Sequence, residues 1–250
     1  MLIITADDYG KTRLATDCIL EVFLRNRITS ASAMVFMEDS ERAASLASRH
    51  DLEIGLHLNF TEPFSARNIP LKLREHHSRV GSYLTKRKWC QVIYNPFLAD
   101  SFNFLFLSQR EEFIRLYGRL PDYYNGHHHM HLCANVLASK MMPSGALVRR
   151  TFTFDVGAKN PFNLLYRDIL AIWVSRNFVS TDAFFSIEPV HNHERLRNII
   201  SRAAKETIEL EVHPENVEEM DFLLSDQYLS LVESVHKVGF LYLHHNLHHS

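Results

Sequence analysis

Four histidines occur within the seven residues from Asn125 to His131, well inside the chain. Neutral imidazole is the commonest metal ligand in proteins, and few structural needs place four of them together. The cluster follows the polar turn Pro121-Asp122 and precedes an apolar run that begins at Leu132. We therefore expect it where a strand opens into a loop or helix, and we favour a metal site there. A solvated His-rich loop without a metal is the alternative.

Other polar residues follow apolar segments that read as strands: the adjacent pair Asp7-Asp8, then His57, then His213. Neighbouring carboxylates repel each other, which raises one pKa unless a cation or hydrogen bonds intervene. Asp8 as the N-cap of the next helix is the structural alternative, and either histidine alone could be a buried core residue. Because parallel strands end at one face of a sheet, we expect these side chains to converge.

The order of elements predicts an α/β fold. Apolar strand patterns at 2–6, 29–36 and 53–58 alternate with helical patterns at 12–26 and 39–49. Such alternation is typical of parallel strands with crossover helices. Further helices are expected at 109–118, 132–140, 194–205 and 226–238, with strands at 207–212 and 240–243. No repeat or linker interrupts the chain, so we expect one domain over 1–250, with a long loop or lid insertion at about 60–107.

Composition limits the partners. With 46% apolar and 22% charged residues the chain is globular in composition, and its formal net charge of −2 gives no basic face for nucleic acid. Three widely spaced cysteines fit reduced thiols rather than a disulfide framework. No signal peptide or membrane span is evident, because Asp7-Asp8 interrupts the first apolar run and Leu164 to Val174 is too short. We expect a cytoplasmic protein without membrane or nucleic-acid partners, with a homodimer left open.

Five motifs in register resemble the YdjC-like family of carbohydrate deacetylases, a family that includes chitooligosaccharide deacetylases. The resemblance covers most of the chain, and each motif alone is weak. The motifs are Ile4 to Gly10, Ile28 to Ser30, Gly55 to Pro63, His127 to His131 and Val212 to Pro214. The family implies a distorted (β/α) barrel with fewer than eight mainly parallel strands and a site at their C-terminal face.

The same resemblance implies roles for individual residues. Asp8, His57 and His127 match the ligands of one divalent metal, Asp7 matches the catalytic base, and His213 matches the general acid. The implied reaction removes an acetyl group from an N-acetylated sugar, a small-molecule substrate. Amide hydrolysis needs an activated water, a stabilised oxyanion and a proton for the amine, which these residue types supply. Zinc or magnesium is expected first, with manganese or cobalt as alternatives.

Five more residues are expected to contact the substrate or to support the metal ligands: Asn125, His129, His131, Thr61 and Glu62. Alternation along a strand would put His127, His129 and His131 on one face and His128 on the other. The chain departs from the family pattern at Asn125-Gly126, where an Asp-Ser pair is common, and in the loop after His57. An amide at position 125 can still accept a hydrogen bond but carries no charge.

Two other functions use the same residues. Two histidines and one carboxylate also describe non-haem Fe(II) enzymes, although those sites usually lie on antiparallel barrels. A non-catalytic metal-binding or sugar-binding protein is the third reading, under which Asp7 would be dispensable. The histidines at 244, 245, 248 and 249 match no motif and are read as a solvated tail.

Overall fold

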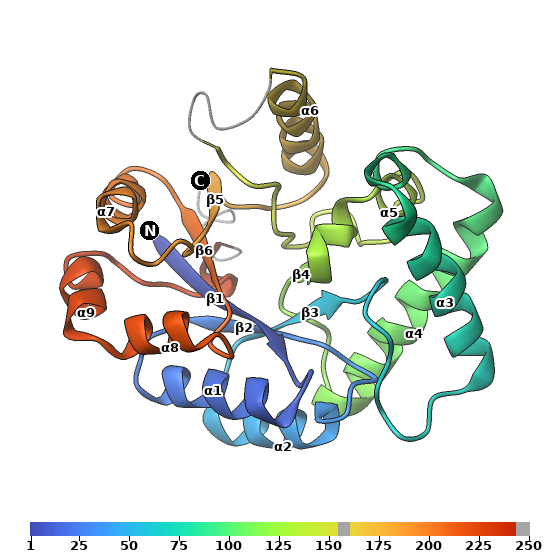
Figure 1. Cartoon of the computed structure of the whole chain (residues 1–250), viewed down its shortest axis with the longest axis horizontal. Helices are drawn as coiled ribbons and strands as arrows, with labels where there is room; N and C mark the ends of the chain where they lie inside the picture. The colour runs from blue at the N-terminus through green and yellow to red at the C-terminus, as the bar shows by residue number, and fades with distance from the viewer. Residues whose placement is uncertain (155–160, 244–250) are drawn as a thin grey trace.

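A computed structural model of the chain describes residues 1–154 and 161–243. Within these residues six strands form one sheet of order β4-β3-β2-β1-β6-β5, and every paired strand is parallel. The strands are β1 (Leu2–Tyr9), β2 (Ser30–Ala33), β3 (Ile54–Leu58), β4 (Tyr124–Gly126), β5 (Ala183–Ser186) and β6 (Ile208–Val212). The sheet curls into a half-barrel surrounded by helices, so the predicted distorted (β/α) barrel with fewer than eight strands is confirmed (Figure 1).

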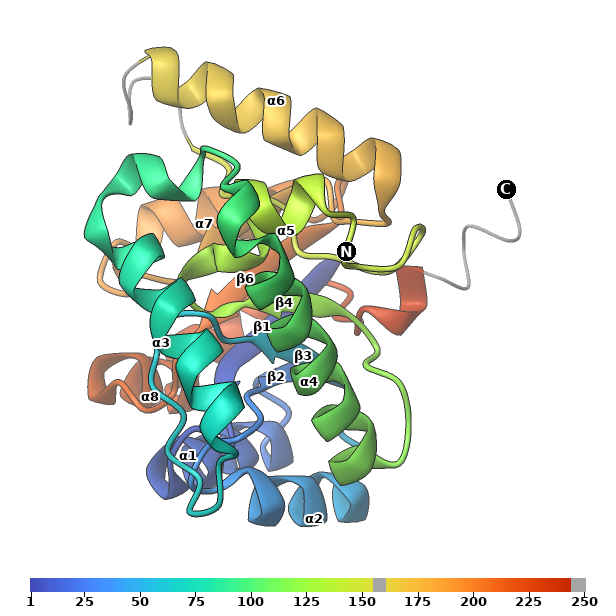
Figure 2. The same cartoon turned by 90° about the vertical axis from the view of Figure 1, so that its right-hand side faces the viewer.

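The helices cover the outer face of this half-barrel (Figure 1). The α-helices are α1 (Arg13–Leu24), α2 (Ser40–His50), α3 (Leu71–Lys86), α4 (Ala99–Tyr117), α5 (Ala134–Ala138), α6 (Pro161–Asn177), α7 (His193–Arg202), α8 (Val217–Leu224) and α9 (Asp226–Val232). Short 3-10 helices are η1 (Lys88–Gln91), η2 (Pro96–Leu98) and η3 (His127–Leu132). Figure 2 shows α3 and α4 packed side by side, with α6 lying across the end of the molecule farthest from α2. None of the described helices is long and apolar enough to cross a membrane.

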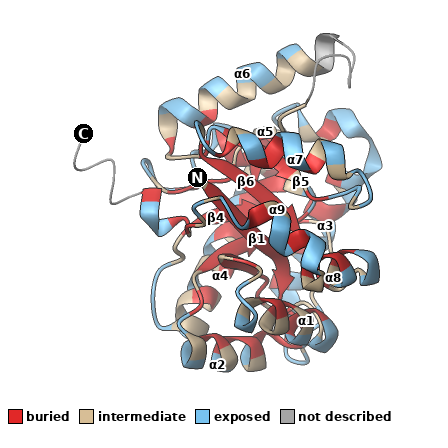
Figure 3. Cartoon of the chain, turned by 90° about the vertical axis from the view of Figure 1, so that its left-hand side faces the viewer, coloured by how far each residue is buried: buried red, intermediate tan, exposed pale blue. Residues whose placement is uncertain are grey.

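Strand β1 shows how the sequence separates the two faces of the sheet. Successive side chains of a strand point to opposite faces. Leu2, Ile4 and Ala6 belong to the large core under the helices. Ile3 instead packs inside the curl with Tyr123 and Phe240, whose rings stack at 4.0 Å. All eight residues of β1 are buried, and Figure 3 shows the strands as the buried centre of the molecule.

Residues 146–153 fill the gap between the two edge strands. At one end Tyr124 of β4 donates its amide to Leu147, and at the other Thr153 donates to Phe184 of β5. This segment therefore closes the inside of the half-barrel opposite β1. It also carries Arg149, whose side chain is fully buried.

The inside of the curl needs a glycine at position 55. A Cβ atom there would lie 2.3 Å from the ring of Tyr123, which real contacts do not allow. A glycine inside a strand often marks such a close approach. The Tyr123 hydroxyl in turn contacts Ser32 Oγ at 3.1 Å, beneath the candidate site.

Two expectations for secondary structure were wrong, and one strand was missed. The segment 60–107, expected to be mainly loop, contains the 16-residue helix α3 and the start of the 19-residue helix α4. Residues 241–243 are helical rather than a strand. Strand β5 was not anticipated, because Ala183–Ser186 is too short to show a period. The histidines at 244–249 lie outside the described residues.

Candidate metal and catalytic centre

A bulge at the end of β1 brings two adjacent aspartates to one site. Ala6 pairs with Ala31 and Tyr9 with Ala33, so β1 has one more residue than β2 between these pairs. Asp8 takes a left-handed conformation with φ of 67°, a region that aspartate tolerates better than most residues. In a regular strand Asp7 and Asp8 would point to opposite faces. The extra residue lets both reach the site, and both are 2% exposed.

Asp8, His57 and His127 form what we call the Asp8 cluster. Asp8 Oδ1 lies 3.0 Å from His127 Nδ1 and 3.3 Å from His57 Nε2. One ligand atom from each of the three residues lies within 4.8 Å of the others, and all three residues are buried. Burial opposes ionisation of Asp8, but hydrogen bonds from His127 and His57 outweigh burial and hold its pKa below the ordinary range. The carboxylate is therefore ionised.

Asn125 fixes the orientation of the His57 ring. Its Oδ1 lies 2.8 Å from His57 Nδ1, so Nδ1 is the donor and Nε2 is the nitrogen presented to Asp8. The amide nitrogen donates to Asp7 Oδ1 at 3.1 Å and to Ser32 Oγ at 2.7 Å. A carboxylate at position 125 could not donate to Asp7 without a proton. The uncharged amide, predicted to support the metal ligands, therefore fits this particular neighbourhood.

The histidine run is a turn and not a strand. Its residues form the 3-10 helix η3, and His128 and His129 both take left-handed conformations, with φ of 52° and 59°. The expected strand alternation of the four histidines was therefore wrong. The chain reverses at once after Gly126, where a Cβ atom would lie 3.0 Å from the backbone nitrogen of His131. This reversal separates the directions of the four imidazoles.

Arg149 binds Asp7, Glu209 and Glu211, and these four residues are here called the Arg149 cluster. Its guanidinium contacts Asp7 Oδ2 at 2.5 Å and Asp7 Oδ1 at 2.9 Å. It also donates to Glu209 at 2.7 Å and to Glu211 at 3.0 Å. Both glutamates come from β6 and face the inside of the curl. A buried charge persists only when it is paired and hydrogen-bonded, and one cation here balances three acids.

The pKa values of the three acids shift in different directions. Burial favours the neutral form of Asp7, but the Arg149 charge and that of His57 outweigh it and lower the pKa of Asp7. For the glutamates burial prevails: it raises the pKa of Glu209 to about 7 and that of Glu211 well above its usual value. Asp7 is therefore the carboxylate that stays ionised near neutral pH.

The Asp8 cluster fits a divalent metal better than a second group of possible ligands next to it does. Asp7, Glu211 and His213 also offer ligand atoms within 4.8 Å of one another. Arg149 already contacts two of these residues and supplies positive charge there. The Asp8 cluster offers two imidazoles and one carboxylate, a donor set that suits zinc and several other divalent metals.

Lys11 contacts the outer side of the Asp8 cluster. Its ammonium lies 2.9 Å from Asp8 Oδ2 and 3.5 Å from Glu215 Oε1. Asp8 does not cap the following helix, because Thr12 accepts the hydrogen bond of Ala15 there. The helix-cap alternative for Asp8 is therefore wrong.

His213 lies beside Asp7, in a group of residues separate from the Asp8 cluster. It follows β6 directly and is half-buried. Its backbone nitrogen donates to Glu219 Oε2 at 2.6 Å, which fixes the start of the loop that carries the imidazole. Its ring and Asp7 are close enough to share a small polar group between them.

The remaining predicted residues divide into two groups. Thr61 and Glu62 border the Asp8 cluster: Thr61 Oγ1 lies 3.0 Å from His128 Nδ1, and Glu62 Oε2 lies 3.9 Å from His127 Nε2. His129 Nε2 lies 3.9 Å from Glu211 and its ring meets Phe152. His131 is buried and its Nε2 contacts the Arg149 carbonyl oxygen at 3.0 Å. His131 therefore supports the backbone of Arg149 rather than facing a substrate.

Sequence reasoning missed Arg149, Glu209 and Glu211. Arg149 lies in a segment without a strand or helix pattern, so nothing placed it at the sheet. The two glutamates gave a usable signal. They alternate with apolar residues in Ile208–Val212, and both faces of a parallel strand are covered. Acidic side chains on such a strand indicate a buried hydrogen-bonding or cationic partner.

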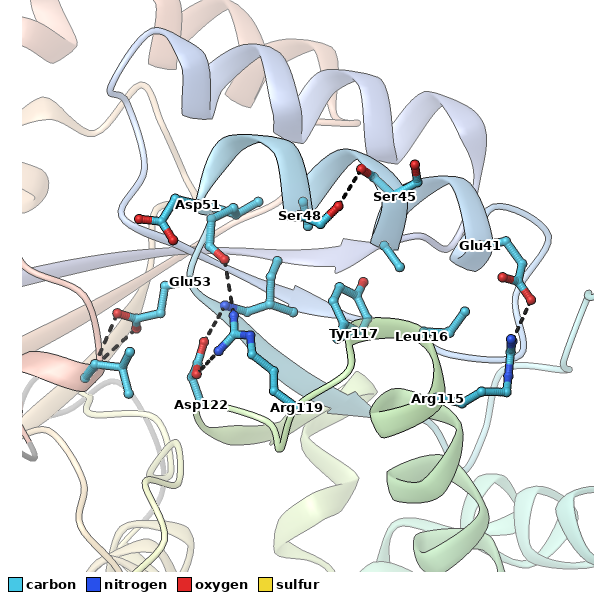
Figure 4. Close-up of a pocket in the computed structure, with 15 residues that line it drawn as sticks. Glu41, Ser45, Ser48, Asp51, Glu53, Arg115, Leu116, Tyr117, Arg119 and Asp122 are labelled. Atoms are coloured by element: carbon cyan, nitrogen blue, oxygen red, sulfur yellow. Dashed lines mark hydrogen bonds and ion pairs between the residues drawn. The ribbon is translucent and has the colours of Figure 1, made fainter.

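A large cavity lies away from this centre. It has a volume of about 780 Å³ and is bordered by α2, the end of α4 and the start of β3, at the opposite end of the strands. Figure 4 shows its polar rim, where Arg119 pairs with Asp122 and Arg115 with Glu41. None of the residues predicted for the site lines it. Its size therefore does not mark the reaction centre.

Comparison with known proteins gives one family match and several relatives. The model of the family described as YdjC-like protein matches residues 1–234. The chain is 31% identical over 145 residues to a carbohydrate deacetylase of Mus musculus, covering 54% of this chain and 44% of that protein. It is 28% identical over 133 residues to a chitooligosaccharide deacetylase of Serratia marcescens, covering 53% and 51%. The chain spans about half the length of the curated relatives it matches.

A solved structure matches almost the whole chain. It is a protein of Enterococcus faecalis described as a candidate cellobiose-phosphate cleavage protein, with a TM-score of 0.67 and 16% identity. The match covers 97% of this chain and 98% of that one. At this identity the likeness concerns the fold alone.

Proposed function

The chain belongs to the YdjC-like family, and from this we propose that it is a metal-dependent hydrolase that removes the acetyl group from an N-acetylated sugar. One observation carries the proposal. The Asp8 cluster and the ionised Asp7 lie side by side at the C-terminal ends of parallel strands. Relatives named for deacetylation of carbohydrates and of chitooligosaccharides support the choice of substrate class.

Asp8, His57 and His127 would hold the metal, with zinc or magnesium expected first and manganese or cobalt as alternatives. When bound, such an ion acts as a Lewis acid that polarises the acetyl carbonyl and acidifies water. Asn125 keeps His57 Nε2 directed at the site. Asp8 contributes the negative charge that offsets part of the ion's charge.

Asp7 is proposed to take the proton of the attacking water. The water oxygen bonds to the acetyl carbon while the carbon–nitrogen bond breaks, and the sugar nitrogen leaves with a proton. Arg149 holds both Asp7 oxygens and thereby fixes the carboxylate. A carboxylate of lowered pKa is a weak base, so it holds the proton briefly and needs an acidified water as its donor.

His213 is proposed to give the sugar nitrogen its proton. It lies beside Asp7 but outside the Asp8 cluster, so the departing amine can sit between Asp7 and the imidazole. The proton that leaves the water is matched by the proton that reaches the amine. The products are acetate and a free amino sugar.

The test is a substrate panel with the protein loaded separately with zinc, magnesium, manganese or cobalt. N-acetylated mono- and disaccharides are supplied and released acetate is measured, with Asp7→Asn as the matched control. Release by the wild type and its loss in the control are expected. No release from any sugar would overturn the proposal and favour a non-catalytic sugar-binding protein. Oxygen consumption with Fe(II) would instead favour the iron enzyme, whose ligand set is the same.

The predicted cytoplasmic location, single domain and lid role of 60–107 remain predictions. So does the homodimer.

A further inference from the structure

The connection between α3 and α4 exposes a group of large apolar side chains. Five of them fall within nine residues: Trp89, Val92, Ile93, Tyr94 and Phe97. Their exposed fractions run from 44% for Tyr94 to 92% for Phe97. Single exposed apolar residues are ordinary, but a group of this size in one place usually marks an interaction site. Figure 2 shows this connection at the outer edge of the molecule, toward the end that carries α6.

Hydrogen bonds and a buried side chain anchor the backbone of this connection. The Asn135 side chain of α5 accepts from the Asn95 nitrogen at 3.0 Å and donates to the Asn95 carbonyl oxygen at 2.8 Å. The Tyr83 hydroxyl donates to the Ile93 carbonyl oxygen at 3.2 Å. Leu98 is buried in the large core. The apolar side chains are therefore held at the surface by contacts of the segment that carries them.

The 3-10 helix η1 gives two of these side chains the same direction. Residues three apart in a 3-10 helix are eclipsed. Val92 donates its amide to the Trp89 carbonyl oxygen at 3.1 Å, whereas Cys90 between them is buried. Trp89 and Val92 thus present one apolar face to the surroundings.

A basic run directly precedes the apolar group. Lys86, Arg87 and Lys88 are consecutive and exposed. The first acidic residues on either side along the chain are Glu75 and Asp100. The formal net charge of the whole chain is −2, so this positive charge belongs to one surface and not to the protein as a whole. We call these three residues and the five apolar ones the α3–α4 surface.

We propose that the α3–α4 surface binds a lipid bilayer that carries anionic headgroups. Tryptophan and tyrosine side chains favour the level of the headgroups, and phenylalanine and aliphatic side chains favour the hydrocarbon just below it. Lysine and arginine beside them are attracted to the anionic headgroups. Stable peripheral attachment takes two signals, and a basic run next to an apolar group supplies both.

A second copy of the chain fits this surface less well. A two-fold dimer brings the same patch of both copies together. Lys86, Arg87 and Lys88 would then lie near their own counterparts, and like charges brought together at an interface oppose binding. An anionic bilayer instead supplies negative charge along the whole patch. Such a peripheral contact needs no membrane-spanning segment, so it replaces the expectation of a protein without a membrane partner.

Sedimentation of the full chain with sucrose-loaded vesicles tests the proposal. Vesicles of phosphatidylcholine with about one third phosphatidylglycerol are compared with vesicles of phosphatidylcholine alone. The wild type is expected to bind the anionic vesicles at least tenfold more tightly, and added salt should reduce the difference.

Two variants separate the contributions of charge and apolar contact. One combines Lys86→Gln, Arg87→Gln and Lys88→Gln, and the other carries Phe97→Ser. Each should weaken binding to the anionic vesicles at least tenfold. Leu14→Ser, which changes another exposed apolar residue on α1 at the opposite end of the molecule, is the matched control and should bind like the wild type.

Tryptophan fluorescence adds a measurement at the surface itself. The chain has two tryptophans, Trp89 and Trp173, so Trp173→Phe leaves Trp89 as the only one. The ring of Trp173 meets that of Phe178, and phenylalanine keeps an aromatic ring at this contact. The emission of Trp89 should shift to shorter wavelength with the anionic vesicles, because the indole moves from water into the bilayer interface.

Three outcomes would overturn the proposal. The first is a wild type that does not sediment with the anionic vesicles. The second is loss of binding in the charge variant alone, with unchanged Trp89 emission, because the apolar residues would then have no part in attachment. The third is a wild type that light scattering shows to be dimeric and that Phe97→Ser makes monomeric, which would assign the surface to a second copy.

Discussion

The guanidinium of Arg149 contacts both carboxylate oxygens of Asp7, at 2.5 and 2.9 Å, from a segment 142 residues away in the sequence. Paired contacts of this kind fix a carboxylate in orientation as well as in charge. The same guanidinium contacts Glu209 and Glu211, so Asp7 is held by a network and not by a single partner. The candidate base is thus positioned in part by residues 146–153, which lie outside every strand of the sheet.

Replacing Arg149 by methionine should lower the free energy of unfolding by about 3–5 kcal/mol, because three buried acids lose their cation. Urea denaturation followed by circular dichroism measures the change. Adding Glu209→Gln and Glu211→Gln to the same chain should restore part of the loss, since neither amide can ionise beside Asp7 once the cation is gone. If Arg149→Met alone leaves stability unchanged, the buried network contributes nothing.

Asp7→Asn should reduce turnover by about 10²–10⁴-fold, the range typical of a lost general base. The amide has the same shape and its one oxygen can still accept from Arg149, so metal affinity should persist. The free energy of unfolding should fall, because the buried guanidinium loses its ionised partner. Acetate release measures the first effect, and equilibrium dialysis with zinc measures the second. Unchanged turnover would show that Asp7 is not the base.

Asp8→Asn should weaken metal binding directly, because it removes the one carboxylate of the Asp8 cluster. Zinc at 100 times its dissociation constant should stabilise the wild type by about 2.7 kcal/mol, and the variant much less at that concentration. Thermal denaturation with and without zinc measures this difference. Asp17→Asn, on the exposed side of α1, is the matched control. Equal stabilisation of all three proteins would place the metal elsewhere.

Glu53 should make stability fall as the pH rises through neutrality. Its carboxylate accepts from the backbone nitrogens of Phe240 and Leu241, and burial raises its pKa to about 7. A folded-state pKa above the unfolded value means that the folded state binds the extra proton. The contribution of Glu53 to the free energy of unfolding is full below about pH 4.5. It is lost as the pH rises through about 7, at no more than about 1.4 kcal/mol per pH unit.

Glu53→Gln tests this dependence, since the amide cannot ionise. Urea midpoints at pH 5 and pH 8 should differ less in the variant than in the wild type. Glu38→Gln, which replaces another glutamate remote from Phe240 and Leu241, is the control. A variant with the same pH dependence as the wild type would contradict the assignment to Glu53.

The fold could be predicted because its signals are local. Apolar strand runs and helix periods appear directly in the sequence, and parallel strands bring Asp7, Asp8, His57 and His127 to one face by geometry. The fixed order of elements was enough to place residues far apart in the chain within a few ångströms of one another.

The second half of the site could not be predicted in this way. Arg149 reaches Asp7 from a segment whose position depends on pairing with both sheet edges, a tertiary effect without a local period. The turn at His128 and His129 depends on two consecutive residues in the left-handed conformation. A histidine in the sequence does not predict that conformation. In both cases the backbone conformation is determined by tertiary contacts and not by the local sequence.

The neighbours of β1 have a consequence for synthesis. β1 pairs with β2, which is made within the next few tens of residues, and with β6, which begins at residue 208. Ribosomes add about 5–20 residues per second, so one edge of the first strand waits on the order of tens of seconds for its partner. During that interval Asp7 and Asp8 stand on an unfinished sheet, without Glu209, Glu211 or the residues that cover Tyr123. We expect a nascent chain halted before β6 to need a chaperone, whereas the same chain released after residue 243 should not.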